Sequence, residues 1–134
     1  MPGYSVTPLP KKLGIKDGFR VHFVSLPADV GRELGEALTK CAAVSDGISA
    51  IDFAMIFTNA KRELAREIKA VFKRLEPAGM LWVSWPKKSS GVTTDLDENK
   101  VREIGLEAGL VDVKVCAVTD VWSGLKFVRR VKDR

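Results

Sequence analysis

The segment from residue 51 to residue 91 constrains the fold of this 134-residue chain more than any other. It reads IDFAMIFTNAKRELAREIKAVFKRLEPAGMLWVSWPKKSSG, which is an apolar run, an amphipathic stretch, a Pro-Ala-Gly turn, a second apolar run and a polar loop. Short apolar runs are typical of buried strands, and apolar residues spaced three and four apart are typical of a helix. The segment therefore predicts a strand–helix–strand unit in a parallel sheet that is covered on both faces.

The same patterns predict further elements on both sides of this unit. Asp29 and Asn59 are candidate caps at the starts of two helices, and a third helix begins near Asp95–Glu98 and stops at Gly109. The expected strands cover residues 19–25, 41–44, 111–117 and 125–131, and the first helix covers residues 30–39. The predicted fold is α/β, a three-layer Rossmann-like sheet that is mostly parallel and ends in a C-terminal antiparallel hairpin.

Length and composition favour one domain over residues 1–134, because 46% of the residues are hydrophobic and can form one ordinary core. Residues 1–16 contain three prolines and two glycines, so we expect them to form an extended N-terminal arm without regular structure. The first residues lack the apolar core of a signal peptide, and no run approaches the length of a membrane span. We therefore expect a cytoplasmic protein with no membrane association.

Few residues of the kinds that bind metals or act as nucleophiles are present. Cys41 and Cys116 are isolated, so neither a disulfide framework nor a zinc site is expected. The only histidine, His22, lies inside a predicted strand. Ser84 lacks the Gly-x-Ser-x-Gly turn that exposes a nucleophile, and the carboxylates near Asp95 are typical of a helix start. The sequence therefore predicts no metal and no cofactor, and it favours a binding protein over an enzyme.

Positive charge is in excess, with 22 Lys plus Arg against 17 Asp plus Glu. Much of the excess lies near the two ends of the chain, at Lys11-Lys12 and Lys16 and at Lys126 and Arg129-Arg130. If the ends meet in space, they form one positive face for an anionic partner. Nucleic-acid binding through the arm and the tail is therefore one of the alternatives.

The polar loop after the last strand of the central unit is the strongest candidate for a ligand site. Ligands of parallel sheets bind beyond the carboxyl ends of the strands. Two ammonium groups, hydroxyls and a nearby glycine suit a phosphate or a carboxylate, although the loop lacks the spacing of a P-loop. The candidate ligand-binding residues are Trp85, Lys87, Lys88 and Ser89, with Ser25, Thr58 and Asn59 at the neighbouring strand ends.

From residue 51 onward the chain has a strand, a helix that ends in Leu75-Glu76-Pro77-Ala78-Gly79, a strand, a helix and a hairpin. This order resembles the second half of a class I S-adenosylmethionine-dependent methyltransferase. The resemblance implies a glycine-rich turn after the first strand and an acidic residue after the second. The first strand is instead followed by Ser25-Leu26-Pro27, which contains no glycine. The candidate for the acidic residue is Asp46, but an Asp directly before a glycine, here Gly47, is typical of a turn.

A second resemblance covers nearly the whole chain. The blocks that carry it are Gly3-Tyr4-Ser5, Thr7-Pro8-Leu9, Lys11-Lys12-Leu13-Gly14-Ile15, Leu81-Trp82-Val83-Ser84-Trp85-Pro86-Lys87-Lys88 and Val121-Trp122-Ser123-Gly124-Leu125-Lys126. Together they resemble the uncharacterised bacterial family called domain of unknown function 3052. The resemblance implies a bacterial origin and brings no activity with it.

These observations favour a non-catalytic Rossmann-like protein that binds an anionic small ligand or a protein partner at the carboxyl edge of its sheet. A divergent S-adenosylmethionine-dependent methyltransferase-like enzyme is the first alternative. A basic nucleic-acid-binding protein is the second.

Overall fold

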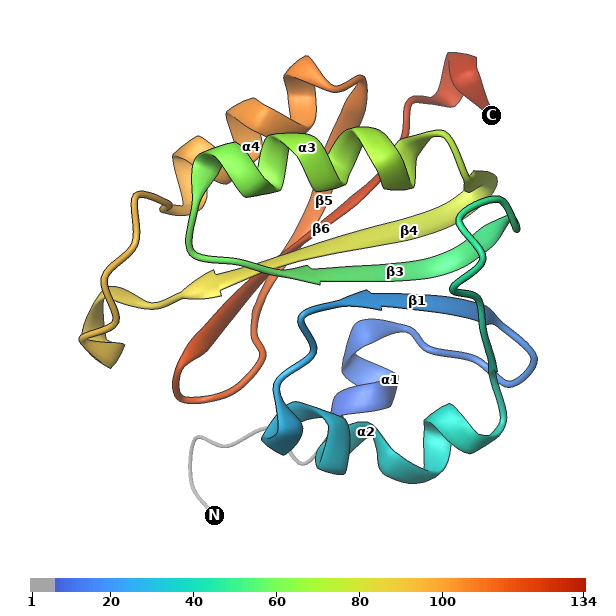
Figure 1. Ribbon diagram of the computed structural model, residues 1–134, viewed down its shortest axis with the longest axis horizontal. Helices are drawn as coiled ribbons and strands as arrows, with labels where there is room; N and C mark the ends of the chain where they lie inside the picture. Colours follow the sequence, from blue (N-terminus) through green and yellow to red (C-terminus); the bar gives the residue numbers. More distant parts are fainter. Residues whose placement is uncertain (1–6) are drawn as a thin grey trace.

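The computed structural model describes residues 7–134, which form one six-stranded sheet with helices on both faces (Figure 1). The strand order is β2-β1-β3-β4-β6-β5, and the expected Rossmann-like, mostly parallel sheet is confirmed. In chain order the elements are α1 (Leu9–Leu13), β1 (Arg20–Val24), α2 (Ala28–Thr39), β2 (Ala42–Ala43), β3 (Ile51–Phe57), α3 (Lys61–Phe72), β4 (Leu75–Pro86), the short 3-10 helix η1 (Lys88–Ser90), α4 (Glu98–Glu107), β5 (Leu110–Ala117), β6 (Trp122–Arg129) and the 3-10 helix η2 (Val131–Asp133).

The central β3–α3–β4 unit forms as its sequence predicts. β3 pairs in parallel with β1 and β4, and all of its residues except Asp52 are buried. The amphipathic helix α3 turns Leu64, Ile68 and Val71 toward the sheet and its charged residues toward solvent. Burial of apolar side chains on both faces therefore fixes the position of β3 in the middle of the sheet.

The predicted Pro-Ala-Gly turn is instead a large irregular bulge inside β4. While β3 advances from Ile51 to Phe53, β4 advances from Leu75 to Met80, so the residues between them loop out of the ladder. Gly79 sits where a Cβ would lie only 3.0 Å from the Ile51 carbonyl oxygen. Pairing with β3 on both sides of the bulge keeps the chain in the sheet, so the strand begins earlier than predicted.

The predicted C-terminal hairpin is confirmed, and its second strand lies inside the sheet. β6 runs antiparallel to both β4 and β5, and β5 forms the sheet edge. β6 begins at Trp122, three residues before the predicted Leu125. The register shifts between Asp112 and Lys114, and Val113 is left 54% exposed. Val113 stays exposed because an edge strand needs only partial cover.

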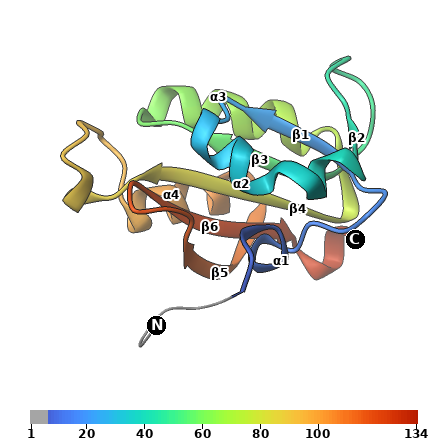
Figure 2. The ribbon, with the colours of Figure 1, turned by 90° about the horizontal axis from the view of Figure 1, so that it is seen from below.

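The two faces of the sheet carry separate cores. One core lies under α3 and α4 and includes Leu81, Val83 and Phe127. The other lies under α1 and α2 and includes Phe53, Phe57 and Trp82. Figure 2 shows α1 next to β6 and β5. Because α1 has only five residues, it covers only part of its face, and the three-layer arrangement is asymmetric.

The prediction that residues 1–16 form an extended arm is wrong for Leu9–Leu13, which form α1. Pro8 and Pro10 start this helix at positions where a missing amide costs nothing. Leu13 is buried, and its carbonyl oxygen accepts a 2.9 Å hydrogen bond from the Trp82 indole nitrogen. These contacts hold the segment against the sheet, whereas residues 1–6 of the predicted arm lie outside the described residues.

The helix starts also differ from prediction. Neither Asp29 nor Asn59 is a cap, because α2 begins after Pro27 and α3 after Ala60. The first amide of α3, that of Lys61, donates to Asp95 Oδ1 at 2.8 Å. A carboxylate 34 residues further along the chain therefore takes the place of the predicted local cap.

Candidate functional site

The loops after β3 and β4 meet at the carboxyl edge of the sheet, the edge at which β1, β3 and β4 end. The Asn59 carbonyl oxygen accepts hydrogen bonds from the Thr94 hydroxyl at 2.7 Å and from the Asp95 amide at 3.3 Å. The Asn59 side chain donates to the Thr93 carbonyl oxygen at 3.5 Å. These bonds join the two loops into one surface.

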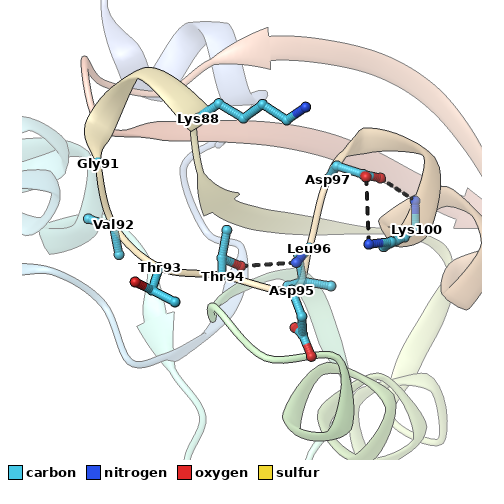
Figure 3. A pocket seen from close by; sticks show the side chains of 9 residues that line it. All are labelled: Lys88, Gly91, Val92, Thr93, Thr94, Asp95, Leu96, Asp97 and Lys100. Carbon is cyan, nitrogen blue, oxygen red and sulfur yellow. Dashed lines mark hydrogen bonds and ion pairs between the residues drawn. The ribbon is translucent and has the colours of Figure 1, made fainter.

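An open hollow of about 450 Å³ lies beside this junction (Figure 3). One wall comes from η1 and the loop that follows it, and the other from the first turn of α4. Gly91, with φ of +75°, turns the chain between η1 and the loop. The lining residues are Lys88, Gly91, Val92, Thr93, Thr94, Asp95, Leu96, Asp97 and Lys100.

The two carboxylates of the hollow already have partners in the chain. Asp95 accepts from the Lys61 amide, as described above. Asp97 caps α4 by accepting from the Lys100 amide at 2.8 Å, and its other oxygen lies 3.9 Å from Lys100 Nζ. Both acids therefore stabilise helix starts, where negative charge is favourable.

Hydrogen-bond donors, in contrast, remain open in the same hollow. Lys88 is exposed and takes part in no ion pair with any residue from 7 to 134. The amides of Thr93 and Thr94 donate to no atom of these described residues. An ammonium group beside free amides is an arrangement that suits carboxylate or phosphate oxygens.

Six of the seven predicted site residues divide into three groups in the structure. Lys88 lines the hollow, and the exposed Ser89 lies next to it in η1. Lys87 and Asn59 lie in the adjoining segments, where the Lys87 amide donates to the Val121 carbonyl oxygen at 2.8 Å. Trp85 and Thr58 are each only 5% exposed, so Trp85 packs in the core and the Thr58 hydroxyl accepts from the Ala60 amide.

Ser25 lies apart from the hollow, since β3 separates β1 from β4. It is exposed and has a left-handed backbone, with φ of +57°, at the turn after β1. Leu26 packs toward Gly31, where a Cβ would lie 3.5 Å from the Leu26 side chain. The structure therefore leaves Ser25 at a strained turn and outside the lining of the hollow.

Sequence reasoning included the glycine of this loop, Gly91, but missed residues 92–94 and Lys100. The loop has no periodicity, and its free amides become visible only when its hydrogen bonds to Asn59 are known. A signal for Lys100 was present, because an Asp97 cap places the residue three positions later in the first turn of α4.

The basic tail residues have structural partners. Arg129 donates to the carbonyl oxygens of Phe72 and Leu75, at 2.6 and 2.7 Å, and its guanidinium lies 4.4 Å from the centre of the Phe72 ring. Arg130 donates to the Leu106 carbonyl oxygen at 3.0 Å. These arginines neutralise the carboxyl-terminal ends of α3 and α4.

The sequence matches the model of one family, Protein of unknown function (DUF3052), over residues 10–131. The chain belongs to this family. No curated protein matches the chain.

Solved structures with a similar fold are methyltransferases and related proteins at low sequence identity. A Methanococcus jannaschii fibrillarin pre-rRNA processing protein is 14% identical, with a TM-score of 0.56 over 95% of this chain and 70% of the other. Magnesium protoporphyrin IX methyltransferase from Synechocystis, with bound SAH, is 12% identical, with a TM-score of 0.60 over 85% and 75%. Aeropyrum pernix fibrillarin, with natively bound S-adenosylmethionine, is 13% identical, with a TM-score of 0.56 over 94% and 70%. This chain therefore has a methyltransferase-like fold.

The candidate acidic residue, Asp46, does not lie at the carboxyl edge, where a methyltransferase-like fold would hold its cofactor. β2 has only two residues, paired with the start of β1, so the loop after it stays at the amino edge of the sheet. Asp46 lies in that loop and contacts Ser49 and Arg74, whose neighbour Leu75 begins β4. These hydrogen bonds, above all the one from the Ser49 hydroxyl, lower the pKa of Asp46 to about 2. Asp46 therefore cannot reach a ligand at the carboxyl edge.

Side chains with catalytic potential also have structural roles. The Ser84 hydroxyl donates to the Ser123 carbonyl oxygen at 2.8 Å and is buried, and His22 Nδ1 lies 3.1 Å from the Val44 carbonyl oxygen. Residues 7–134 contain no cluster of His, Cys, Asp and Glu that could hold a metal ion. Within the same range, every helix is too short or too polar to cross a bilayer.

Proposed function

We propose that this protein is a non-catalytic Rossmann-like binding domain whose ligand is a small anion held in the hollow at the carboxyl edge. The observation that carries the proposal is the contrast between acids and donors in that hollow. Asp95 and Asp97 are bound to helix starts, whereas Lys88 and the amides of Thr93 and Thr94 have no described partner. An anion would satisfy these donors without displacing a bond of the fold.

The size and the polarity of the hollow support a small ligand with a carboxylate or phosphate group. Its volume of about 450 Å³ falls within the range of small-molecule sites. Trp85 is buried, so the ligand would be held by charge and hydrogen bonds, without stacking on this ring. We assign the main contact to Lys88, and secondary contacts to the amides of Thr93 and Thr94 and to Lys100.

Titration of the isotope-labelled protein with inorganic phosphate tests this proposal. We expect the amide signals of Thr93 and Thr94 to shift in a saturable way. Lys88→Ala should weaken the affinity about tenfold, the loss expected for one charge-assisted hydrogen bond. Lys87→Ala is the matched control, because it removes the same charge from the neighbouring residue, which does not line the hollow.

Equal affinity in the wild type and Lys88→Ala would contradict the proposal, provided that the variant melts at the wild-type temperature. A larger loss in Lys87→Ala than in Lys88→Ala would also contradict it, since the binding residue would then lie outside the hollow.

A methyltransferase-like enzyme is the second candidate, and the fold similarity to structures with bound S-adenosylmethionine or SAH favours it. A protein that binds S-adenosylmethionine gains about 2.7 kcal/mol of stability at about 100 times the dissociation constant. Asp46 lies at the amino edge, and the turn after β1 contains Leu26-Pro27 in place of a glycine. We therefore expect S-adenosylmethionine to leave the melting temperature unchanged. A saturable rise would favour the enzyme instead.

A further inference from the structure

A group of lysines lies on the C-terminal hairpin, on the face of the sheet that α1 covers. Lys126 of β6 is the register partner of both Lys114 of β5 and Trp82 of β4. Cross-strand partners point to the same face of a sheet. Because Trp82 belongs to the core under α1 and α2, the side chains of Lys114 and Lys126 also lie on that face.

Lysines of the N-terminal segment complete the group. Lys12 Nζ donates to the Ala117 carbonyl oxygen at 3.1 Å, and Lys114 Nζ donates to the Lys12 carbonyl oxygen at 3.3 Å. Two reciprocal bonds thus hold α1 against β5 and keep both ammonium groups where these elements meet. The ribbon in Figure 2 shows α1 beside β5 and β6. Lys16 follows α1 and acts electrostatically on Lys126. We call Lys12, Lys16, Lys114 and Lys126 the hairpin lysine cluster.

The charges of the hairpin lysine cluster are uncompensated within the described part of the chain. None of the ion pairs formed by residues 7–134 includes any of the four lysines. Lys126 is half-buried, and burial together with Lys114 and Lys16 lowers its pKa. Burial raises the pKa of the nearby Cys116 thiol, and the positive charges of Lys12 and Lys114 oppose that rise. The cluster therefore stores repulsion that an anion would relieve.

We propose that the hairpin lysine cluster binds the phosphate chain of a small polyphosphate. Several ammonium groups spread over one face match a ligand with several negative charges better than a single carboxylate. The large apolar side chains exposed on residues 7–134 are Ile, Val and Leu, so this part of the chain offers no exposed aromatic ring for base stacking. A short polyphosphate uses charge alone, and it is the ligand we favour over a nucleic-acid strand.

This inference is independent of the anion site proposed at the carboxyl edge, and sodium tripolyphosphate at constant ionic strength tests it. We expect the wild type to bind tripolyphosphate, and Lys114→Gln with Lys126→Gln to weaken binding by at least about tenfold. The matched control is Lys69→Gln with Lys73→Gln, which removes two exposed charges from α3 and its carboxyl end. The control should retain the wild-type affinity.

The ionisation of Lys126 provides a second readout that does not depend on the variants. Nuclear magnetic resonance of the lysine side chains should show the pKa of Lys126 rising when tripolyphosphate is added, because the ligand replaces repulsion by attraction. An unchanged pKa in Lys126 together with equal affinity in the double variant would overturn the proposal. Tighter binding of a short single-stranded oligonucleotide than of tripolyphosphate would also overturn it.

Discussion

The two edges of the sheet differ in how their charged side chains are used. At the amino edge, Arg20 donates to Asp52 at 3.0 Å and to Glu76 at 3.1 Å, so one guanidinium links β1, β3 and β4. At the carboxyl edge, Lys88 takes part in no ion pair and the amides of Thr93 and Thr94 have no partner among residues 7–134. The amino edge therefore uses its charges for stability, and the carboxyl edge leaves donors available to a ligand.

A second cluster of charged residues at the amino edge also stabilises the fold. Arg74 donates to the Ser49 carbonyl oxygen at 3.0 Å and lies 3.6 Å from Asp46. In the same region, Arg129 donates hydrogen bonds to the carbonyl oxygens of Phe72, at the end of α3, and of Leu75, at the start of β4. Substitutions at this edge should therefore change stability, whereas Lys88→Ala should change ligand affinity and leave the melting temperature unaltered.

We expect the largest effect from Arg129→Ala. The variant leaves the carbonyl oxygens of Phe72 and Leu75 without their charged donor and removes the contact with the Phe72 ring. Loss of these interactions should lower the free energy of unfolding by about 2 kcal/mol, measured by urea denaturation. Arg130→Ala, which removes a single exposed bond to Leu106, should cost less than half as much. A loss in Arg129→Ala no larger than in Arg130→Ala would contradict this role.

Asp52→Asn should have the next largest effect, about 1 kcal/mol at pH 7, because the ion pair with Arg20 is partly exposed. Hydrogen bonds from Arg20 lower the pKa of Asp52. A carboxylate with a lowered pKa stabilises the fold above its unfolded pKa, and the contribution disappears as the pH falls through the folded pKa. The difference between wild type and Asp52→Asn should therefore shrink in acid. A difference that grows in acid would exclude the ion pair as its cause.

Ser25→Gly should stabilise the protein slightly, by about 0.5 kcal/mol, because glycine adopts a positive φ without the strain of a side chain. Thermal denaturation measures the change. Ser25→Ala is the control, since alanine keeps the Cβ and removes only the hydroxyl. If Ser25→Ala is as stable as Ser25→Gly, the left-handed backbone is not the cause.

The smallest stability effect should come from Asp46, which is exposed and accepts its hydrogen bonds from its own loop. Its pKa of about 2 lies below the unfolded value of about 3.9. The wild type should lose its advantage over Asp46→Asn as the pH falls from about 4 to about 2. Melting temperatures of both proteins over this range measure the loss. A constant difference across the range would contradict the lowered pKa.

The sequence predicts the central unit well because its information is local. Residues 51–57 are almost all apolar, and only a strand covered on both faces buries such a run at this length. The bulge at Pro77–Gly79 depends on pairing with Ile51, and the start of α3 depends on Asp95. Neither partner can be identified from local propensity, so the turn and the Asn59 cap were predicted wrongly.

The candidate site was predicted only in part for the same reason. Lys88 follows a buried strand, so its place at the carboxyl edge could be predicted from its position alone. Trp85 lies inside β4, near its end, and faces the core, because alternation along β4 and the cover of α4 decide its direction. Thr93 and Thr94 contribute through backbone amides, which leave no pattern in the side chains.

The most direct test of the difference between the edges is a phosphate titration of the wild-type protein that follows every backbone amide by nuclear magnetic resonance. The account predicts saturable shifts at Thr93 and Thr94 of the carboxyl edge, and unchanged signals at Ile48 and Ser49 of the amino edge. Saturable shifts at Ile48 and Ser49 with none at Thr93 and Thr94 would contradict it, because the open donors would then lie at the wrong edge.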